Sequence, residues 1–596
     1  MCKVQLRLMR RKINQNQKAL KVDIEALSAK ATRDRFRQTL EEKLAAAEFQ
    51  GTVTQLNSAI HTAADEVLPM ASKIRKPWIS ADTKDLADKK RSLKQRRHES
   101  ESTEKEYRKL CNQVRKAARH DKDQWLLEQC EDIQQSYAEN KIRKTFRLIK
   151  DINRQWQPRQ LAVKNKNGKT LQSKEEVMER WTEYCSELYK DKDGTSPVVA
   201  ELEKIAPPPQ QGDDPILREE VVQAINKLKK RKSPGTDGIP GELIQAGGEV
   251  LIDHIHAICQ KAWEQERMPE EWTKSVIITI PKKGDLRECS NYRTISLMNH
   301  MSKVMMMILL ERLKPQLEPY LSEEQAGFRK DRSTIQQILT LRLMAEKALE
   351  KGNKIYNCFV DFQKAFDTIK QNVIWAVLSS YGIQAKLIRV LQQLYEQSKA
   401  AVKMGKDIGE WFMQTLGTKQ GDPLSPLIFI SHLERLMDKA EDGVKEPVSI
   451  HGRLIDNLRF ADDIDLIQKS CNSLQQEMDN LYEAGRKVGL RVNVAKTKTM
   501  VFGSTKIERH IELGGKDIEN VEEFVYLGSL VSWDNDCSKD IQRRIGKATG
   551  AFEGFTKVWQ SKAIRIQTKT RILSVCVMSV LLYAAETWTL KKRDTN

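Results

Sequence analysis

Hydrophobic and polar positions follow three different patterns along the chain. Residues 1–200 contain little Gly or Pro, and apolar positions such as Leu110 and Val114 recur at helical spacing. From 216 to about 530, helical patterns alternate with short runs rich in β-branched residues, and helical periodicity returns from 540 onward. The pattern predicts an α+β fold in which helical segments flank a mixed central region.

Four short runs in the central region have the composition of strands: 276–280, 355–362, 458–467 and 499–502. Ahead of them, three consecutive prolines at 207–209 interrupt any helix, so we expect a linker at 203–215. A chain of 596 residues is also too long for one compact core. Several structural units are therefore expected.

The chain carries a formal net charge of +19, which favours contact with a polyanion such as nucleic acid. Part of this charge lies at 84–119, where 13 Lys and Arg face 6 Asp and Glu; a solvated helix face explains the segment equally well. No apolar run reaches 18 residues, so no membrane contact is expected. Ten scattered cysteines without a Cys-x-x-Cys pair favour a reduced intracellular compartment, the cytoplasm or nucleus.

Two adjacent acids, Asp462 and Asp463, stand between short apolar runs in the sequence FADD at 460–463. This arrangement is typical of a β-hairpin whose tight turn presents carboxylates at its tip. Clustered carboxylates repel one another unless a cation lies among them, so a divalent metal is the natural partner. An ordinary Asp-rich turn would have the same composition.

A third acid, Asp361, ends the nearly continuous apolar run 354–362, which predicts a buried strand. If this strand lies beside the hairpin, Asp361 and Asp462 can bind two Mg²⁺ ions for nucleotidyl transfer, and Mn²⁺ would serve as well. Between the acids, the sequence GTKQGDPLSP at 417–426 predicts a loop that permits close backbone approach, followed by a helix with Pro426 in its first turn. A well-capped helix explains Ser425 and Pro426, but not the two glycines around Gln420.

In this order, Asp361, the loop at 417–426, FADD at 460–463 and GLRVNVAKT at 489–497 resemble the reverse transcriptases of non-LTR, LINE-like retrotransposons. Upstream, KSPGTDGIP at 232–240, IPKKG at 280–284, SNYRTISL at 290–297 and QAGFR at 325–329 are similar to the fingers motifs of that family. The resemblance is close over 215–535.

The resemblance implies a right-hand polymerase with fingers, palm and thumb. Its expected divisions are a basic helical N-terminal extension (1–202), the linker (203–215), a fingers region (216–350), a palm with the catalytic acids (351–535) and an incomplete helical thumb (536–596). The endonuclease that accompanies such polymerases is not recognised in the sequence, so DNA nicking would need a separate protein.

Residue roles follow from the same resemblance. The implied catalytic residues are Asp361, Asp462, Asp463 and Lys496, and the three acids are the metal ligands. The implied nucleotide-binding residues are Lys282 (or its neighbour Lys283), Arg293, Phe362, Phe366 and Gln420, of which Phe366 would exclude a ribose 2′-hydroxyl. The implied nucleic-acid-binding residues are Lys232, Arg329, Tyr526, Leu527, Gly528, Arg543 and Arg544.

Several alternatives stay open at this point. Phe366 also fits a core packing stripe, and the basic cluster at 229–232 could be a nuclear localisation signal. Thr294 occupies a position where the family usually has Pro. The expected partners are an RNA template, a DNA primer and a dNTP. A catalytically silent retroelement relic that binds RNA is the main alternative function, and an intron-maturase or telomerase-like enzyme is another.

Overall fold

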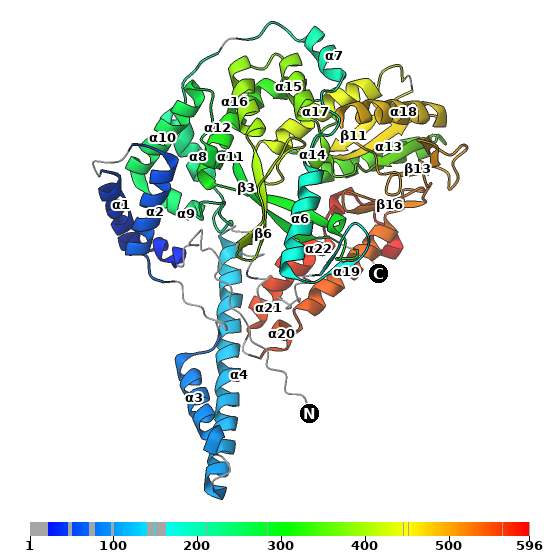
Figure 1. The fold of residues 1–596 in the computed structure, drawn as a ribbon. Helices are drawn as coiled ribbons and strands as arrows, with labels where there is room; N and C mark the ends of the chain where they lie inside the picture. Colours follow the sequence, from blue (N-terminus) through cyan, green and yellow to red (C-terminus); the bar gives the residue numbers. More distant parts are fainter. Residues whose placement is uncertain are drawn as a thin grey trace, which may run out of the picture.

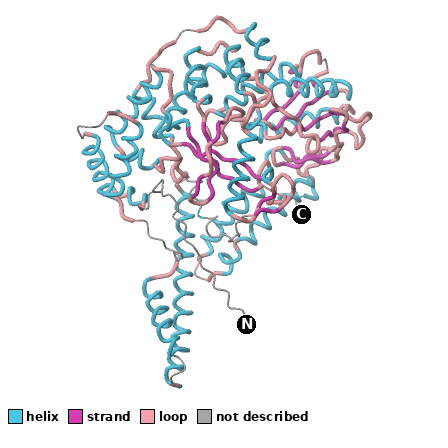
Figure 2. The backbone as a smooth tube through the Cα atoms, viewed as in Figure 1, coloured by secondary structure: helices cyan, strands magenta, loops and turns pink. Residues whose placement is uncertain are grey.

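The computed structural model describes residues 22–45, 50–70, 78–96, 100–139, 148, 162–210, 212–282, 284–444, 446–450, 452–562 and 564–594. Strands lie at the centre of the molecule and helices surround them (Figures 1 and 2). This mixed architecture confirms the expected combination of helices and sheets. Among the described helices, none has an apolar stretch long enough to cross a membrane.

The first sheet contains the predicted catalytic segments. Its four antiparallel strands follow the order β11 (Asn457–Phe460), β12 (Asp463–Gln468), β5 (Ile355–Val360) and β13 (Lys498–Phe502). All six residues of β5 are buried, as its apolar sequence predicts. Successive side chains point to opposite faces, so Cys358 joins the core that includes α18 (Cys471–Val488), whereas Phe359 joins the core that includes α13 (Thr334–Glu350). We call this sheet the palm sheet, after the expected region at 351–535 that contains all four of its strands.

The second sheet contains β4 (Tyr292–Met298), β3 (Lys274–Pro281), β6 (Lys399–Met404) and β7 (Asp407–Ile408) in that order, and β8 (Phe412–Met413) pairs with β6. Strands β3 and β6 run parallel, and the other pairs are antiparallel. We call it the fingers sheet, after the region at 216–350 in which the sequence places β3 and β4; β6, β7 and β8 come from the region expected to be palm, 351–535.

Helix α6 (Lys174–Leu188) lies within the predicted N-terminal extension, yet it is part of the fingers core. Its Trp181 and Cys185 are buried with Ile277 of β3 and Val402 of β6. The expected separation of residues 1–202 from the fingers therefore does not describe how α6 packs. Burial of an amphipathic helix depends on its tertiary partner, which sequence periodicity does not identify.

Most remaining helices surround these sheets. They are α7 (Val198–Ile205), α8 (Arg218–Lys227), α9 (Gly241–Ala246), α10 (Gly248–Glu264), α11 (Glu270–Thr273), α12 (His300–Leu317), α14 (Ala365–Thr368), α15 (Gln371–Ser380), α16 (Ala385–Glu396) and α17 (Ser425–Ala440). Proline lies in the first turn of α17, as predicted. Helix α7 continues through Ile205 and so overlaps the start of the linker expected at 203–215, whereas the described residues between 206 and 217 contain no helix or strand.

The N-terminal helices form two groups. Helices α1 (Lys30–Leu44) and α2 (Val53–Val67) join the main core. Helices α3 (Ala81–Arg96) and α4 (Glu101–Ala138) lie side by side and project from the body as an arm (Figure 1). The short hairpin of β1 (Val163–Lys164) and β2 (Thr170–Leu171) precedes α6.

The C-terminal part includes the hairpin of β16 (Glu523–Tyr526) and β17 (Ser529–Ser532), followed by α19 (Ser538–Gly554), α20 (Thr556–Gln560), α21 (Ile566–Ile572) and α22 (Ser579–Leu581). Two small hairpins complete the list. The hairpin of β9 (Val448–Ile450) and β10 (Arg453–Ile455) lies between β5 and β11 in sequence, and that of β14 (Glu512–Leu513) and β15 (Lys516–Asp517) follows β13. The base of the arm packs here, because Cys130 and Ile133 of α4 share a core with Ile572 of α21.

Candidate active site

The two adjacent acids lie at the tip of the predicted hairpin. Strands β11 and β12 pair with Phe460 opposite Asp463, so Ala461 and Asp462 form a two-residue turn. Ala461 has φ of 60°, the left-handed conformation that tight hairpin turns use. The turn therefore projects the Asp462 carboxyl beyond the end of the sheet.

Asp361 lies beside this hairpin, as predicted. Val360 pairs with Ile464, which places the end of β5 next to Asp463. Burial and the charge of Asp361 raise the pKa of Asp462. Desolvation, followed by the charges of Asp462 and Asp361, raises the pKa of Asp463 to about 6. The structure thus brings the three acids together at one end of the palm sheet, where the charge of Asp361 disfavours ionisation of both Asp462 and Asp463.

This repulsion is the condition that a divalent cation would relieve. Among the described residues, no group of three or more Asp, Glu, Cys or His side chains is arranged so that it could hold a metal ion by itself. An open arrangement still suits Mg²⁺, because this ion is usually held by one or two carboxylates together with water and substrate phosphates. The donor set of Asp361, Asp462 and Asp463 is therefore compatible with magnesium.

The segment that follows α18 supports Asp361. The amide of Asn493 donates to Asp361 Oδ2 over 3.0 Å, and the backbone N–H of Asn493 donates to the Asp361 carbonyl over 2.7 Å. Lys496 Nζ lies 3.4 Å from the same Oδ2, with its side chain 68% exposed. Lys496 lies in a turn before β13, where the chain reverses to pair with β5. Its amine therefore lies close to the carboxyl of Asp361.

The loop that contains Gln420 is joined to the chain around Phe366. Gly417 N–H donates to Ile369 O over 2.8 Å, and Thr418 N–H donates to Phe366 O over 2.7 Å. Gly417 has φ of 73°, and a Cβ there would collide with the Asp367 carbonyl. The glycine therefore permits the close approach that the sequence predicted.

Two basic residues face the acids from the end of the fingers sheet. Pro281 pairs with Tyr292, and the next backbone bond, from Lys282 N–H to Asn291 O, measures 2.8 Å. Burial and then the charge of Arg293 lower the pKa of Lys282. Arg293 is exposed, and its charge acts on Asp462. Lys283 lies outside the described residues.

The two phenylalanines near Asp361 differ in exposure. Phe362 is 6% exposed and lies in the main core, so its backbone is the part available to a nucleotide. Phe366 is partly buried and stacks on Phe429, with ring centroids 4.3 Å apart. Phe366 also meets Phe328 edge-on at 6.4 Å. These contacts support the packing interpretation and leave the expected gate role untested.

Arg329 and Lys232, both expected to bind nucleic acid, lie in different environments. Lys232 is exposed. Arg329 has a side chain only 7% exposed, and its guanidinium donates to Glu318 and to the carbonyls of Ser322 and Gln325. This arrangement favours a structural role for Arg329 over the expected phosphate contact.

The expected primer-contacting residues lie around the β16–β17 turn. Tyr526 is buried in the core beneath this turn. The carbonyl of Leu527 accepts from the Tyr583 hydroxyl over 2.8 Å, and the carbonyl of Gly528 accepts from Arg543 over 3.0 Å and also from Arg544. Both arginines thus brace the turn, and Arg543 keeps the more exposed side chain, 27% against 7% for Arg544.

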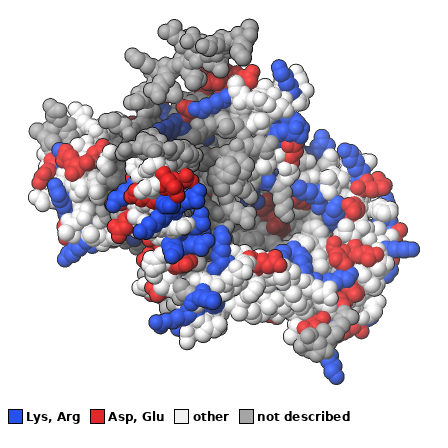
Figure 3. Space-filling model, turned by 90° about the horizontal axis from the view of Figure 1, so that it is seen from below, with Lys and Arg blue, Asp and Glu red and all other residues white. Residues whose placement is uncertain are grey.

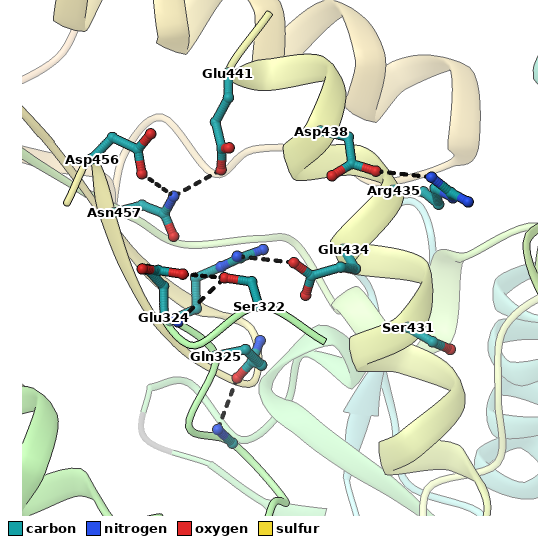
Figure 4. Close-up of polar contacts among 12 residues, drawn as sticks. Ser322, Glu324, Gln325, Ser431, Glu434, Arg435, Asp438, Glu441, Asp456 and Asn457 are labelled. Carbon is teal, nitrogen blue, oxygen red and sulfur yellow. Dashed lines mark hydrogen bonds and ion pairs between the residues drawn. The ribbon is translucent and has the colours of Figure 1, made fainter. Parts of the chain in front are cut away.

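Gln325 supports the catalytic turn, a role that the sequence did not assign. Its Oε1 accepts from Ala461 N–H over 2.9 Å and from Gly327 N–H over 2.8 Å. Gln325 lies on a loop with Ser322 and Glu324, next to the strand that carries Asn457 (Figure 4). The sequence contains no local sign of this contact, because Gln325 and Ala461 are 136 residues apart.

Residues 280–531 match the model of the family described as reverse transcriptase (RNA-dependent DNA polymerase). Relatives include the transposon TX1 uncharacterized 149 kDa protein of Xenopus laevis, 26% identical over 63% of this chain and 28% of that protein. A probable RNA-directed DNA polymerase from transposon BS of Drosophila melanogaster is 24% identical over 63% of this chain and 42% of that protein.

A Pol polyprotein from the type-1 retrotransposable element R2 of Popillia japonica is 29% identical over 53% of this chain and 42% of that protein. The matches thus span 28 to 42% of the length of these three relatives. Among solved structures, an apo telomerase from Candida tropicalis covers 53% of this chain and 57% of its own, with 13% identity and a TM-score of 0.33, which is too low to identify a shared fold.

Proposed function

We propose that this chain is an RNA-directed DNA polymerase of the non-LTR retrotransposon class, because residues 280–531 match the reverse transcriptase family and resemble polymerases of transposon BS and element R2. It extends the 3′-hydroxyl of a DNA primer with dNTPs along an RNA template. The fingers sheet, the palm sheet and the helices that begin with α19 act as fingers, palm and thumb.

One observation carries the proposal. The pairing of Val360 with Ile464 puts Asp361 beside the turn that presents Asp462 and Asp463, although about a hundred residues separate them in sequence. This convergence of three carboxylates, with Lys496 at hand, is the donor set that two-metal nucleotidyl transfer requires. An ordinary Asp-rich turn does not account for Asp361.

Asp361 and Asp462 would hold two Mg²⁺ or Mn²⁺ ions, with Asp463 in support. Such ions, when bound, lower the pKa of the attacking hydroxyl and offset charge on the phosphates. Arg293 and Lys282 bind the triphosphate. Lys496 donates a proton to the departing pyrophosphate.

The test is primer extension on an RNA template with the purified chain and Mg²⁺. Replacing both Asp361→Asn and Asp462→Asn should lower the rate by more than about a thousandfold, because both ligands lose their charge. The melting temperature should not fall, because the substitutions remove carboxylate charges that repel one another at the turn. Glu477→Gln is the matched control: this buried acid of α18 contacts Gln468 and none of the site residues.

Extension that survives the double substitution would show that these acids are not the metal ligands. RNA binding by the unmodified chain without any extension would instead support the alternative function, a silent relic that retains only its affinity for RNA. Measuring affinity and extension on the same preparation separates the two outcomes.

A further inference from the structure

A chain of hydrogen bonds connects the fingers strand β4 to the Gln420 loop through two buried side chains. The Tyr189 hydroxyl lies 2.6 Å from Thr294 Oγ1 and 3.2 Å from Asp367 Oδ1. Gln420 Nε2 lies 3.1 Å from each oxygen of the Asp367 carboxyl. Tyr189 and Asp367 are 1% and 3% exposed, so water cannot replace these contacts.

The direction of each hydrogen bond follows from the ionised Asp367, which can only accept. Gln420 must therefore turn its NH₂ group toward Asp367, which directs its Oε1 away from the carboxyl. Tyr189 donates its single proton to Asp367, and the Thr294 hydroxyl donates to Tyr189. Asp367 thus determines which atom of the Gln420 amide is available to a nucleotide.

Tyr189 also attaches helix α6 to the same loop. Its carbonyl accepts from Thr415 N–H over 2.9 Å and from Leu416 N–H over 3.0 Å. Tyr184, one turn earlier in α6, places its ring 4.5 Å from Lys364 Nζ. Helix α6 lies outside the 280–531 match, yet it contacts three segments of the nucleotide site.

We propose that Asp367 and Tyr189 are positioning residues for nucleotide binding, which fix the Gln420 amide and make α6 an integral part of the polymerase site. This inference rests on the proposed function. Thr294, next to Arg293 in β4, links this chain of hydrogen bonds to the fingers sheet. The family that the sequence resembles usually has Pro at this position, and a proline has no hydroxyl that could form the bond.

Protonation of Asp367 would remove its charge and one of its acceptor sites. The charged and titratable groups that face it are Tyr184 and Cys185 of α6, Tyr189 just after α6, Lys364 from its own segment and Lys282 from the end of β3. Burial outweighs these groups and raises the pKa of Asp367 to about 6. We therefore expect the KM for dNTP to rise as the pH falls below about 6.

The test measures kcat and KM for single-nucleotide incorporation. Asp367→Asn should raise the KM for dNTP about tenfold and Tyr189→Phe about fivefold, because each removes a buried hydrogen bond. The kcat at saturating dNTP should change less than KM. In Asp367→Asn the rise of KM below pH 6 should also disappear.

A double-mutant cycle with Gln420→Ala distinguishes positioning from a general structural effect. If Asp367 acts through Gln420, Asp367→Asn should raise KM no further in the Gln420→Ala background. Matched controls are Glu477→Gln for a buried acid and Tyr381→Phe for a buried tyrosine, whose hydroxyl contacts the Ser431 carbonyl. Neither control should alter KM.

Additive effects in the cycle, or an unchanged KM in Asp367→Asn, would overturn the inference. These outcomes test the inference only if the unmodified chain extends a primer. If the unmodified chain extends no primer, the proposed function itself is overturned. Melting temperatures of all variants show whether any change in KM accompanies a loss of fold.

Discussion

At the scale of single residues, the ring of Phe366 is a candidate for two roles, packing in the core and contact with the sugar of a nucleotide. The ring stacks on Phe429, and its backbone carbonyl accepts from Thr418, so the residue is tied to the loop that contains Gln420. A ring held in this way can also act as a wall against the sugar of a nucleotide. A substitution of Phe366 therefore tests both roles, because the packing role predicts a loss of stability and the gate role predicts weaker discrimination between dNTP and rNTP.

Replacing Phe366→Val should lower the discrimination between dNTP and rNTP roughly 10- to 100-fold, because the smaller side chain admits a 2′-hydroxyl. Stability should fall by roughly 1–3 kcal/mol through lost packing. Incorporation rates for both nucleotides and chemical denaturation measure the two effects. Phe429→Leu is the control: it removes the stacking partner and should lower stability alone. Unchanged discrimination in Phe366→Val would leave Phe366 as a packing residue.

At the scale of elements, the catalytic hairpin depends on a loop from another part of the chain. Gln325 accepts from two backbone N–H groups, one of them in the turn. Gly327 approaches the same turn so closely that a Cβ would collide with the backbone nitrogen of Ala461. The position of Asp462 is therefore determined by this loop as well as by the turn.

We expect Gln325→Ala to lower stability by about 1–3 kcal/mol, since it leaves buried N–H groups without an acceptor. It should also raise the Mg²⁺ concentration needed for half-maximal extension. Gly327→Ala should have a larger effect because backbone must move. Gly241→Ala, where a Cβ would make ordinary contacts, is the control. If both variants needed the same Mg²⁺ concentration as the unmodified chain, the turn at 461–462 would keep its conformation without support from this loop.

Strand β11 also borders two acids that repel one another. The Asn457 amide donates to Glu441 over 2.8 Å and to Asp456 over 2.9 Å, and Figure 4 shows the two carboxyls on either side of it. Burial, followed by the charge of Asp456, raises the pKa of Glu441 to about 7. The folded protein therefore retains this proton at a pH where the unfolded chain has lost it.

A raised carboxyl pKa lowers stability as the pH increases from about 4.5 to about 7, because the unfolded state then binds fewer protons. Glu441→Gln keeps an acceptor for Asn457 and removes the charge. At pH 8 it should raise the free energy of unfolding by roughly 1–3 kcal/mol, and near pH 4 it should have little effect. Urea denaturation at both pH values tests this. Equal effects at both would contradict the assignment.

At the scale of the whole molecule, charge is distributed unevenly. Seen from the side toward which the arm projects, Lys and Arg side chains form patches among acidic ones, including a group on the arm (Figure 3). Lys109, Arg115, Lys116 and Arg119 are exposed on α4. These exposed basic side chains on a projecting helix suit contact with the phosphates of RNA outside the active site.

Replacing Lys109, Lys116 and Arg119 by Ala should weaken RNA binding and reduce its salt dependence. The slope of log K against log salt should become shallower by about 0.7 for each lost phosphate contact. Extension from a short primer–template that cannot reach the arm should be unchanged. Binding at several salt concentrations measures the effect. An unaltered slope would favour a solvated helix face.

Much of the palm followed from the sequence. The apolar run that became β5, the acids at a hairpin turn and the two glycines around Gln420 are local patterns, because strand burial and turn geometry leave direct marks on composition. The structural roles of Arg329 and Arg544 could not be predicted from the sequence, because residue type alone does not distinguish an arginine that stabilises a loop from one that binds phosphate.

The sequence by itself determined the order of the motifs, the residue types of the site and the net positive charge. Only the tertiary structure decided which distant segments meet: Asp361 with Asp462, Gln325 with the catalytic turn, and Tyr189 of α6 with Asp367. Local sequence specifies local conformation, whereas contacts between remote segments depend on strand register and on how the helices pack.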